Sequence, residues 1–172
     1  ADRFGLQCRT GTPAPLDQVF LHAVHAPHPT RDVRILPGIA QKDSGPPDVM
    51  RGEETQLLGL EAASGERIVC MPGTHCKWVR LNGAAVTGFT TFLTGELYNI
   101  FSAHSLLRHS VDPAARVQPD NADFLQACRG MMAAPDQLPA RLFSIRAASL
   151  LQGLTPARAS AVLSGLLIGA EV

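Results

Sequence analysis

The densest group of charged side chains in this sequence lies in residues 48–56, Asp-Val-Met-Arg-Gly-Glu-Glu-Thr-Gln. It places Arg51, Glu53 and Glu54 within four positions, although only 17% of the 172 residues are charged. The two prolines before it cannot continue a helix and Asp48 is a favourable N-cap, so we expect a helix to begin here. Charged groups at such a position are costly unless they bind or react with a ligand, which makes this segment the first candidate site.

The two glutamates are expected to point to different faces of that helix. Glu53 shares a face with Leu57 and Leu60, whereas Glu54 lies on the side of Glu61 and is expected to reach solvent. Glu53 is then the carboxylate held against apolar surface, where its pKa could be tuned for general-base catalysis. The preceding arginine could keep it ionised or bind a substrate carboxylate. The alternative, equally open from the residues alone, is a solvated first turn in which acids favour the helix dipole.

A second candidate site is formed by residues 72–77, Pro-Gly-Thr-His-Cys-Lys, directly after a strand-like run. Backbone N–H groups beside Gly73 and the hydroxyl of Thr74 could approach an anion closely, and Lys77 could neutralise it. The segment is not a Walker motif, which needs a longer glycine loop that opens a helix. The alternative, which the residues alone favour, is an ordinary hairpin turn with an exposed lysine.

A third candidate site is Thr94-Gly95-Glu96, at the start of a helical pattern. Thr94 is expected to cap the helix, leaving backbone N–H groups that could face a phosphate or a sugar hydroxyl. Capping explains the threonine, but it does not explain a helix-weakening glycine in the first turn.

Neither the histidines nor the cysteines predict a metal or redox site. Prolines interrupt the helix that would align the histidines spaced by three, which are His22, His25 and His28. The cysteines lack the paired spacing of zinc and redox sites, and buried free thiols are expected at Cys8, Cys70, Cys76 and Cys128.

The overall composition is that of an ordinary globular domain. Hydrophobic residues make up 45% of the chain, and fifteen basic residues balance fifteen acidic ones. This balance gives no reason to expect a nucleic-acid or membrane partner, and no apolar run approaches the length of a membrane span. A cytoplasmic protein is the expectation.

Most strands that would position these sites are expected before Thr94, and most helices after it. Strands are expected at residues 32–39, 67–71, 77–81 and 86–93, with a tight turn at Asn82-Gly83. Helices are expected at residues 48–65, from Thr94 onward, and at residues 121–133, 138–152 and 156–172. The last of these has Thr155 as its expected N-cap and Pro156 as its first residue.

Four segments in the same order closely resemble the 2-dehydro-3-deoxygalactonokinase family of bacterial sugar-acid kinases. They are residues 48–56, residues 72–79 (Pro-Gly-Thr-His-Cys-Lys-Trp-Val), Thr94–Glu96 with His104-Ser105, and residues 164–172 (Ser-Gly-Leu-Leu-Ile-Gly-Ala-Glu-Val). The resemblance covers nearly all of the chain from about Ile35. It implies an α/β fold with ribonuclease H-like lobes of the actin, hexokinase and Hsp70 superfamily, in which a βββα unit is followed by helices.

The resemblance also implies a role for each candidate site. Glu53 would be the base that deprotonates the terminal hydroxyl of 2-dehydro-3-deoxy-D-galactonate, which then attacks Mg-ATP. The sugar acid would be held by Arg51, Glu54, Thr94, Gly95 and Glu96. The phosphates would be contacted by Gly73, Thr74, His75 and Lys77. The implied cofactors are ATP and Mg²⁺, and the implied partner is a small-molecule sugar acid. The sequence leaves open whether the chain forms a homo-oligomer.

The resemblance implies a division at the connecting helix, with residues 1–65 ending the first lobe and residues 66–172 starting the second. The family's first phosphate hairpin and its adenosine loop have no counterpart here, so we expect a central portion of the kinase. A non-catalytic module that binds a sugar acid or a partner is the alternative. A hydrolase using Glu53 and Glu54 is less favoured, because adjacent helical residues diverge by about 100°.

Overall fold

The computed structural model describes residues 10–43, 45–60 and 64–172, which divide into two compact units. Unit 1 comprises the described residues up to Pro72 together with Cys76–Thr91. Unit 2 comprises Gly73–His75 and Phe92–Val172. The turn at residues 73–75 therefore belongs with the helices and not with the strands on either side of it. The predicted lobe boundary after residue 65 concerns a complete kinase and stays a prediction.

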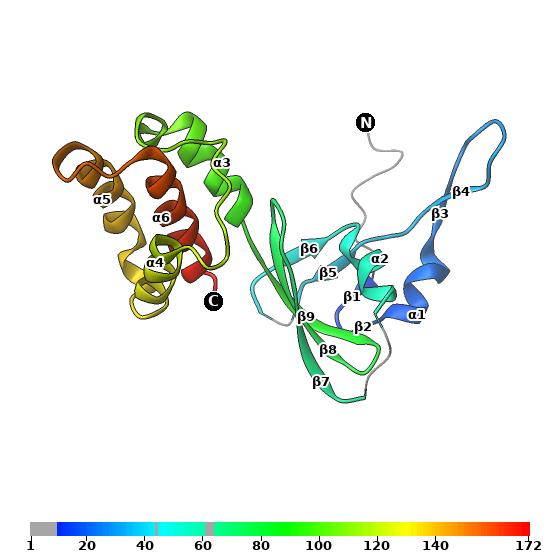
Figure 1. The fold of residues 1–172 in the computed structure, drawn as a ribbon. Helices are drawn as coiled ribbons and strands as arrows, with labels where there is room; N and C mark the ends of the chain where they lie inside the picture. Colours follow the sequence, from blue (N-terminus) through cyan, green and yellow to red (C-terminus); the bar gives the residue numbers. More distant parts are fainter. Residues whose placement is uncertain (1–9, 44, 61–63) are drawn as a thin grey trace. The chain divides into compact units, whose positions relative to one another are not determined.

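Unit 1 contains three small sheets and two short α-helices (Figure 1). One sheet has the order β1 (Thr10–Gly11), β5 (Ile39–Gln41), β6 (Asp48–Met50). The second has the order β2 (Ala14–Pro15), β9 (Ala85–Phe92), β8 (Cys76–Asn82), β7 (Glu66–Met71). The third is the hairpin of β3 (Val24–Ala26) and β4 (Val33–Ile35). The helices are α1 (Leu16–Val19), continued by the 3₁₀ turn Phe20–His22, and α2 (Glu53–Leu58).

The core of unit 1 forms where β8 and β9 turn apolar side chains inward. Val79 and Leu81 of β8, Val86 and Phe89 of β9, and Leu57 of α2 are all buried in one cluster. The strands predicted at residues 67–71, 77–81 and 86–93 are confirmed to within a residue or two. The run predicted as one strand at residues 32–39 is interrupted and contributes to β4 and β5 instead.

Two side chains of the first sheet continue the hydrogen bonding of the second. Gln41 and Asp48 are paired residues of β5 and β6. The Phe89 N–H donates to Gln41 Oε1 at 3.0 Å, and the Thr91 N–H donates to Asp48 Oδ2 at 2.7 Å. The Thr91 hydroxyl donates to the other Asp48 oxygen, also at 2.7 Å. The prediction that Asp48 caps a helix is therefore wrong, because this distant partner holds it in a strand.

Helix α2 is shorter than predicted and begins five residues later. Its N-cap is Gly52, whose φ of 115° lies in a region that side chains rarely adopt. The helix ends at Leu58 and is followed by Gly59, so Leu60 lies beyond it. The predicted continuation through Ala62 and Ala63 lies outside the described residues.

Unit 2 is helical and follows β9 directly, which completes the predicted βββα order (Figure 1). Its α-helices are α3 (Thr94–His104), α4 (Ala122–Met132), α5 (Leu138–Leu151) and α6 (Pro156–Gly169), and 3₁₀ turns occupy Leu106–His109 and Pro135–Gln137. The predicted N-cap Thr155 accepts a hydrogen bond from the Arg158 N–H at 3.5 Å. Across the described residues, no helix combines the length and apolar character needed to cross a lipid bilayer.

Helices α4 and α6 approach each other through glycines. A Cβ placed on Gly165 would lie 2.4 Å from the Phe124 carbonyl oxygen, and one on Gly169 would lie 2.4 Å from the Cys128 carbonyl oxygen. The close packing of α4 against α6 contributes to the core of unit 2. The buried residues of this core include Met131, Ile145, Leu163, Leu166 and Leu167.

The cysteines depart in part from the expected burial. Cys76 is buried, but Cys70 is exposed and Cys128 is half-buried, and all three are free thiols. Cys70 Sγ and Cys76 Sγ lie 3.9 Å apart. Cys8 lies outside the described residues.

Candidate active site

The structure sorts the predicted site residues into two clusters instead of three. The carboxylate cluster lies in unit 1 and consists of Arg51, Glu53, Glu54 and Lys77. The turn cluster lies in unit 2 and consists of Gly73, Thr74, His75, Thr94, Gly95 and Glu96. Lys77 therefore belongs to unit 1, although the turn just before it in the sequence, residues 73–75, belongs to unit 2.

Glu53 and Lys77 form a largely buried ion pair. Lys77 Nζ lies 2.8 Å from Glu53 Oε1, and the two side chains are 5% and 25% exposed. The other carboxylate oxygen of Glu53 accepts the Arg51 N–H at 3.0 Å. Burial raises the pKa of Glu53, but the hydrogen bond and charge of Lys77, together with backbone donors, outweigh it and hold the pKa below its ordinary value. Glu53 is therefore an ionised carboxylate whose two oxygens are both engaged.

Glu54 occupies the more buried position. The residue is only 1% exposed, and its carboxylate accepts the Gly52 N–H at 2.7 Å. Burial raises the pKa of Glu54, and the charge of Glu53 acts in the same direction, against backbone hydrogen bonds that lower it. The prediction that Glu53 faces apolar surface while Glu54 reaches solvent is wrong, because Lys77 draws Glu53 toward β8 and the short helix turns Glu54 inward.

Lys77 does not stand where a phosphate-neutralising lysine is expected. It is the second residue of β8, and the ammonium group that would meet a phosphate is engaged by Glu53. In this arrangement its charge acts on the Glu53 carboxylate. The interpretation of an exposed lysine beside a hairpin turn is wrong as well, since the side chain is buried.

The turn cluster joins the two sequence segments that predicted the second and third sites. His75 Nε2 lies 2.6 Å from Glu96 Oε2, and the Glu96 N–H donates to the Thr74 carbonyl oxygen at 3.0 Å. A Cβ on Gly95 would lie 2.6 Å from the Gly73 carbonyl oxygen. The glycine in the first turn of α3 is therefore explained by the close approach of the residue 73–75 backbone.

Thr94 has a different role from the one predicted. It is the first residue of α3, the N-cap is Leu93, and no side chain among the described residues caps this end of the helix. The Thr94 hydroxyl instead donates to the Glu171 carboxylate after α6. This contact, across 77 positions, could not be inferred from a local capping pattern.

The turn cluster offers groups that suit a phosphate and a magnesium ion only in part. Gly73 and Thr74 are exposed and could bring backbone donors to an anion. Glu96 offers a carboxylate oxygen of the kind that Mg²⁺ binds. The same carboxylate already pairs with His75, so an anion would meet negative charge beside the turn.

A cavity of about 500 Å³ in unit 1 lies against the carboxylate cluster. Its lining combines two arginines, a glutamate, a threonine and apolar side chains, namely Arg34, Ile35, Leu36, Arg51, Gly52, Glu54 and Thr55. Arg51 and Glu54 were predicted as site residues, whereas no sequence pattern singled out Arg34 or Thr55. The position of Arg34 becomes evident only because β4 pairs with β3 and ends beside α2.

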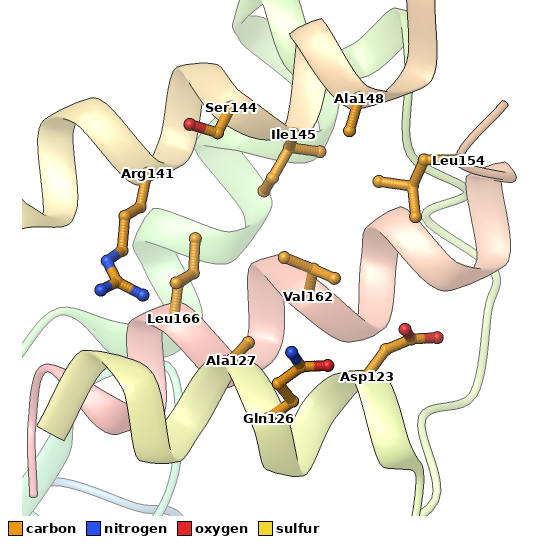
Figure 2. A pocket seen from close by; sticks show the side chains of 10 residues that line it. All are labelled: Asp123, Gln126, Ala127, Arg141, Ser144, Ile145, Ala148, Leu154, Val162 and Leu166. Carbon is orange, nitrogen blue, oxygen red and sulfur yellow. The ribbon is translucent and has the colours of Figure 1, made fainter. Parts of the chain in front are cut away.

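A second cavity, of about 470 Å³, lies among α4, α5 and α6 of unit 2 (Figure 2). Most of its lining is apolar, with Ile145, Leu154, Val162 and Leu166 among the residues that point into it. Asp123 at its edge is already bonded by the Arg158 guanidinium at 2.9 Å through two nitrogens. None of the predicted site residues lines this cavity.

The chain resembles known sugar-acid kinases along most of its length. The family model of 2-keto-3-deoxy-galactonokinase matches residues 7–172. A probable 2-dehydro-3-deoxygalactonokinase of Rhizobium meliloti is 48% identical over 163 residues, covering 94% of this chain and 53% of the relative. A 2-dehydro-3-deoxygalactonokinase of Escherichia coli is 40% identical over 142 residues, covering 82% of this chain and 47% of the relative.

A solved structure gives the same result. The crystal structure of a putative 2-dehydro-3-deoxygalactonokinase protein from Sinorhizobium meliloti aligns with a TM-score of 0.90 at 48% identity. The alignment covers 94% of this chain and 54% of the solved one. The chain thus spans about half the length of the relatives it matches.

Proposed function

Because the chain belongs to the 2-keto-3-deoxy-galactonokinase family, we propose that it acts in the ATP-dependent phosphorylation of 2-dehydro-3-deoxy-D-galactonate at the terminal hydroxyl. The family membership supports a sugar-acid kinase, and the carboxylate cluster supplies groups suited to that chemistry. The finer assignment to lobes of the actin and hexokinase type is part of the same proposal.

The observation that carries the proposal is the contrast between the two neighbouring glutamates. Glu53 is ionised and tied to Lys77, whereas Glu54 is buried, has a raised pKa and lines a ligand-sized cavity. A general base works best when its pKa lies near the operating pH. The sequence predicted Glu53 as the base from its expected apolar helix face and from the family resemblance, and the first of these grounds applies to Glu54 instead. We therefore assign the base to Glu54 and an electrostatic role to Glu53.

In this assignment Glu54 accepts the proton of the terminal hydroxyl as its oxygen forms a bond to phosphorus. ATP, bound with Mg²⁺, supplies the phosphoryl group and releases ADP. Arg51 binds the sugar-acid carboxylate through its guanidinium. The roles predicted for Thr94, Gly95 and Glu96 at the substrate, and for Gly73, Thr74 and His75 at the phosphates, stay proposals for the turn cluster.

Phosphoryl transfer tests the proposal directly. The purified chain is incubated with labelled ATP, Mg²⁺ and the sugar acid, and the product is examined for phosphate on the terminal oxygen. Glu54→Gln should abolish transfer while sparing sugar-acid binding, and Glu53→Gln should retain measurable transfer. An inactive Glu53→Gln beside an active Glu54→Gln would return the base to Glu53.

A non-catalytic sugar-acid-binding module is the second candidate, favoured by the ion pair with Glu53 that engages the Lys77 ammonium group predicted to meet a phosphate. Titration calorimetry with ATP and with the sugar acid distinguishes the two. Binding of the sugar acid together with no binding of ATP would favour the module over a kinase that acts alone.

A further inference from the structure

The unit 1 cavity carries two positive side chains that converge from different elements. Arg34 comes from β4 and Arg51 from the segment between β6 and α2, and both line the same space. Glu54 adds a carboxyl group to the lining, and Thr55 adds a hydroxyl group. Ile35 and Leu36 complete the lining with apolar surface. Its volume of about 500 Å³ falls within the usual range of small-molecule sites, about 300–1,000 Å³.

Asp32 orients the Arg34 guanidinium but does not use all of its N–H donors. Its Nε and Nη2 atoms both lie 3.0 Å from Asp32 Oδ2. Asp32 in turn lies 3.5 Å from His25 Nε2 on the paired strand. A guanidinium has five N–H groups in a planar fork, so this contact with Asp32 leaves three of them for a ligand.

Arg51 is available for the same ligand. Its backbone N–H is used by Glu53, but among the described residues no carboxylate lies within ion-pair distance of its guanidinium. The carboxylate of Glu54 shares this cavity and Asp32 pairs with Arg34, but both guanidiniums keep N–H groups whose hydrogen bonds an anionic ligand can accept. A carboxylate suits this task because its two oxygens accept paired N–H groups.

We infer that Arg34 and Arg51 form a two-arginine clamp for the carboxylate of a hydroxy acid, with Glu54 and Thr55 facing its hydroxylated end. The inference rests on the proposed function and deepens it, since it names the feature that would select a sugar acid over a neutral sugar. Arg34 is its new element, a specificity-determining residue contributed by the β3–β4 hairpin.

A simple surface role for Arg34 is the competing explanation. Its side chain is 68% exposed, and exposed arginine–aspartate pairs contribute little to stability. A surface pair would leave ligand binding unchanged when the arginine is replaced. The clamp instead predicts a loss that is confined to ligands bearing a carboxylate.

Titration calorimetry of the 172-residue chain with 2-dehydro-3-deoxy-D-galactonate and with its uncharged carboxamide separates these cases. Arg34→Gln should weaken binding of the acid by about tenfold to a hundredfold and change binding of the carboxamide less than about twofold. Arg34→Lys should lie between, because it keeps the charge but loses the fork. Arg31→Gln, on the same hairpin and outside the cavity lining, is the matched control and should bind both ligands normally.

Each result bears on the clamp separately from the kinase proposal. Equal binding of the acid by Arg34→Gln and the original chain would overturn the clamp and leave phosphoryl transfer untouched. An original chain that binds the acid no better than the carboxamide, or that binds neither, would also overturn it. The phosphoryl-transfer assay independently decides whether the kinase proposal holds.

Discussion

Replacing Lys77 by methionine should expose how strongly the carboxylate cluster depends on one ion pair. Methionine keeps most of the aliphatic volume and removes the charge that lies 2.8 Å from Glu53. At that separation the attraction is about 6 kcal/mol for an effective dielectric constant near 20, before desolvation is subtracted. Breaking a fully buried pair typically costs about 3–5 kcal/mol. Because Glu53 remains a quarter exposed, we expect Lys77→Met to lower the free energy of unfolding by about 2–3 kcal/mol.

The sole tryptophan, Trp78, adjoins Lys77 in β8, so its fluorescence reports urea unfolding of unit 1. In a double-mutant cycle with Glu53→Gln, the coupling energy should be about 1–3 kcal/mol. Lys42→Met, which removes an exposed lysine of the same unit, should change stability by less than about 0.5 kcal/mol. A similarly small effect of Lys77→Met, with no coupling, would refute the reasoning.

The pH dependence of this ion pair follows from the lowered pKa of Glu53. A lowered pKa in the folded state contributes stability above the unfolded value near 4.5, and this contribution is lost as pH falls through the folded pKa. The destabilisation by Lys77→Met should therefore be full at pH 7 and shrink in acid below about pH 4.5. Trp78-monitored unfolding between pH 3 and pH 7 measures it.

Three further predictions concern burial and close packing. Because the pKa of Glu54 is raised in the folded state, its contribution to stability is present below about pH 4.5 and is lost as pH rises through the folded pKa. Glu54→Gln lacks this dependence. Its free energy of unfolding, measured by urea titration and compared with that of the original chain, should therefore increase with pH. Gly95→Ala forces a Cβ to 2.6 Å from the Gly73 carbonyl oxygen and should destabilise unit 2 by about 1–3 kcal/mol, as measured by far-ultraviolet circular dichroism. Gly165→Ala gains about 1 kcal/mol of helix propensity, but it places a Cβ 2.4 Å from a backbone oxygen of α4, so net destabilisation should appear in the same assay. Gly130→Ala, whose Cβ would meet only the end of the Arg141 side chain, is its matched control and should be neutral or stabilising. Unchanged stability in either destabilising variant would contradict the packing described for it.

The helices of unit 2 could be predicted from the sequence because their signals are local. Asn121 and Thr155 each cap the helix that follows, and the apolar spacing of α6 matches the face it buries. The tight turn between β8 and β9 is predictable in place for the same reason, but it lies at residues 83–84, one residue later than expected, because Asn82 ends β8 and only Gly83 takes a positive φ, 57°. Elements of this kind depend little on what the rest of the chain contributes.

The carboxylate cluster could be located from the sequence, but its geometry could not. Asp48 has the residue type and the neighbours of an N-cap, yet its carboxylate bonds to Thr91, 43 positions away. The orientation of Glu53 depends on its ion pair with Lys77, which comes from strand β8. Periodicity along one helix contains no information about such a partner.

The side-chain hydrogen bonds that Gln41 and Asp48 make to β9 also occupy an edge of the second sheet. Beyond its short pairing with β2, this part of β9 would present unpaired N–H groups at a sheet edge, which is a template for association with other chains. The amide and the carboxylate occupy the N–H groups of Phe89 and Thr91, so another strand cannot pair there without displacing them. The two side chains thus leave these N–H groups of β9 unavailable as a template for an added strand.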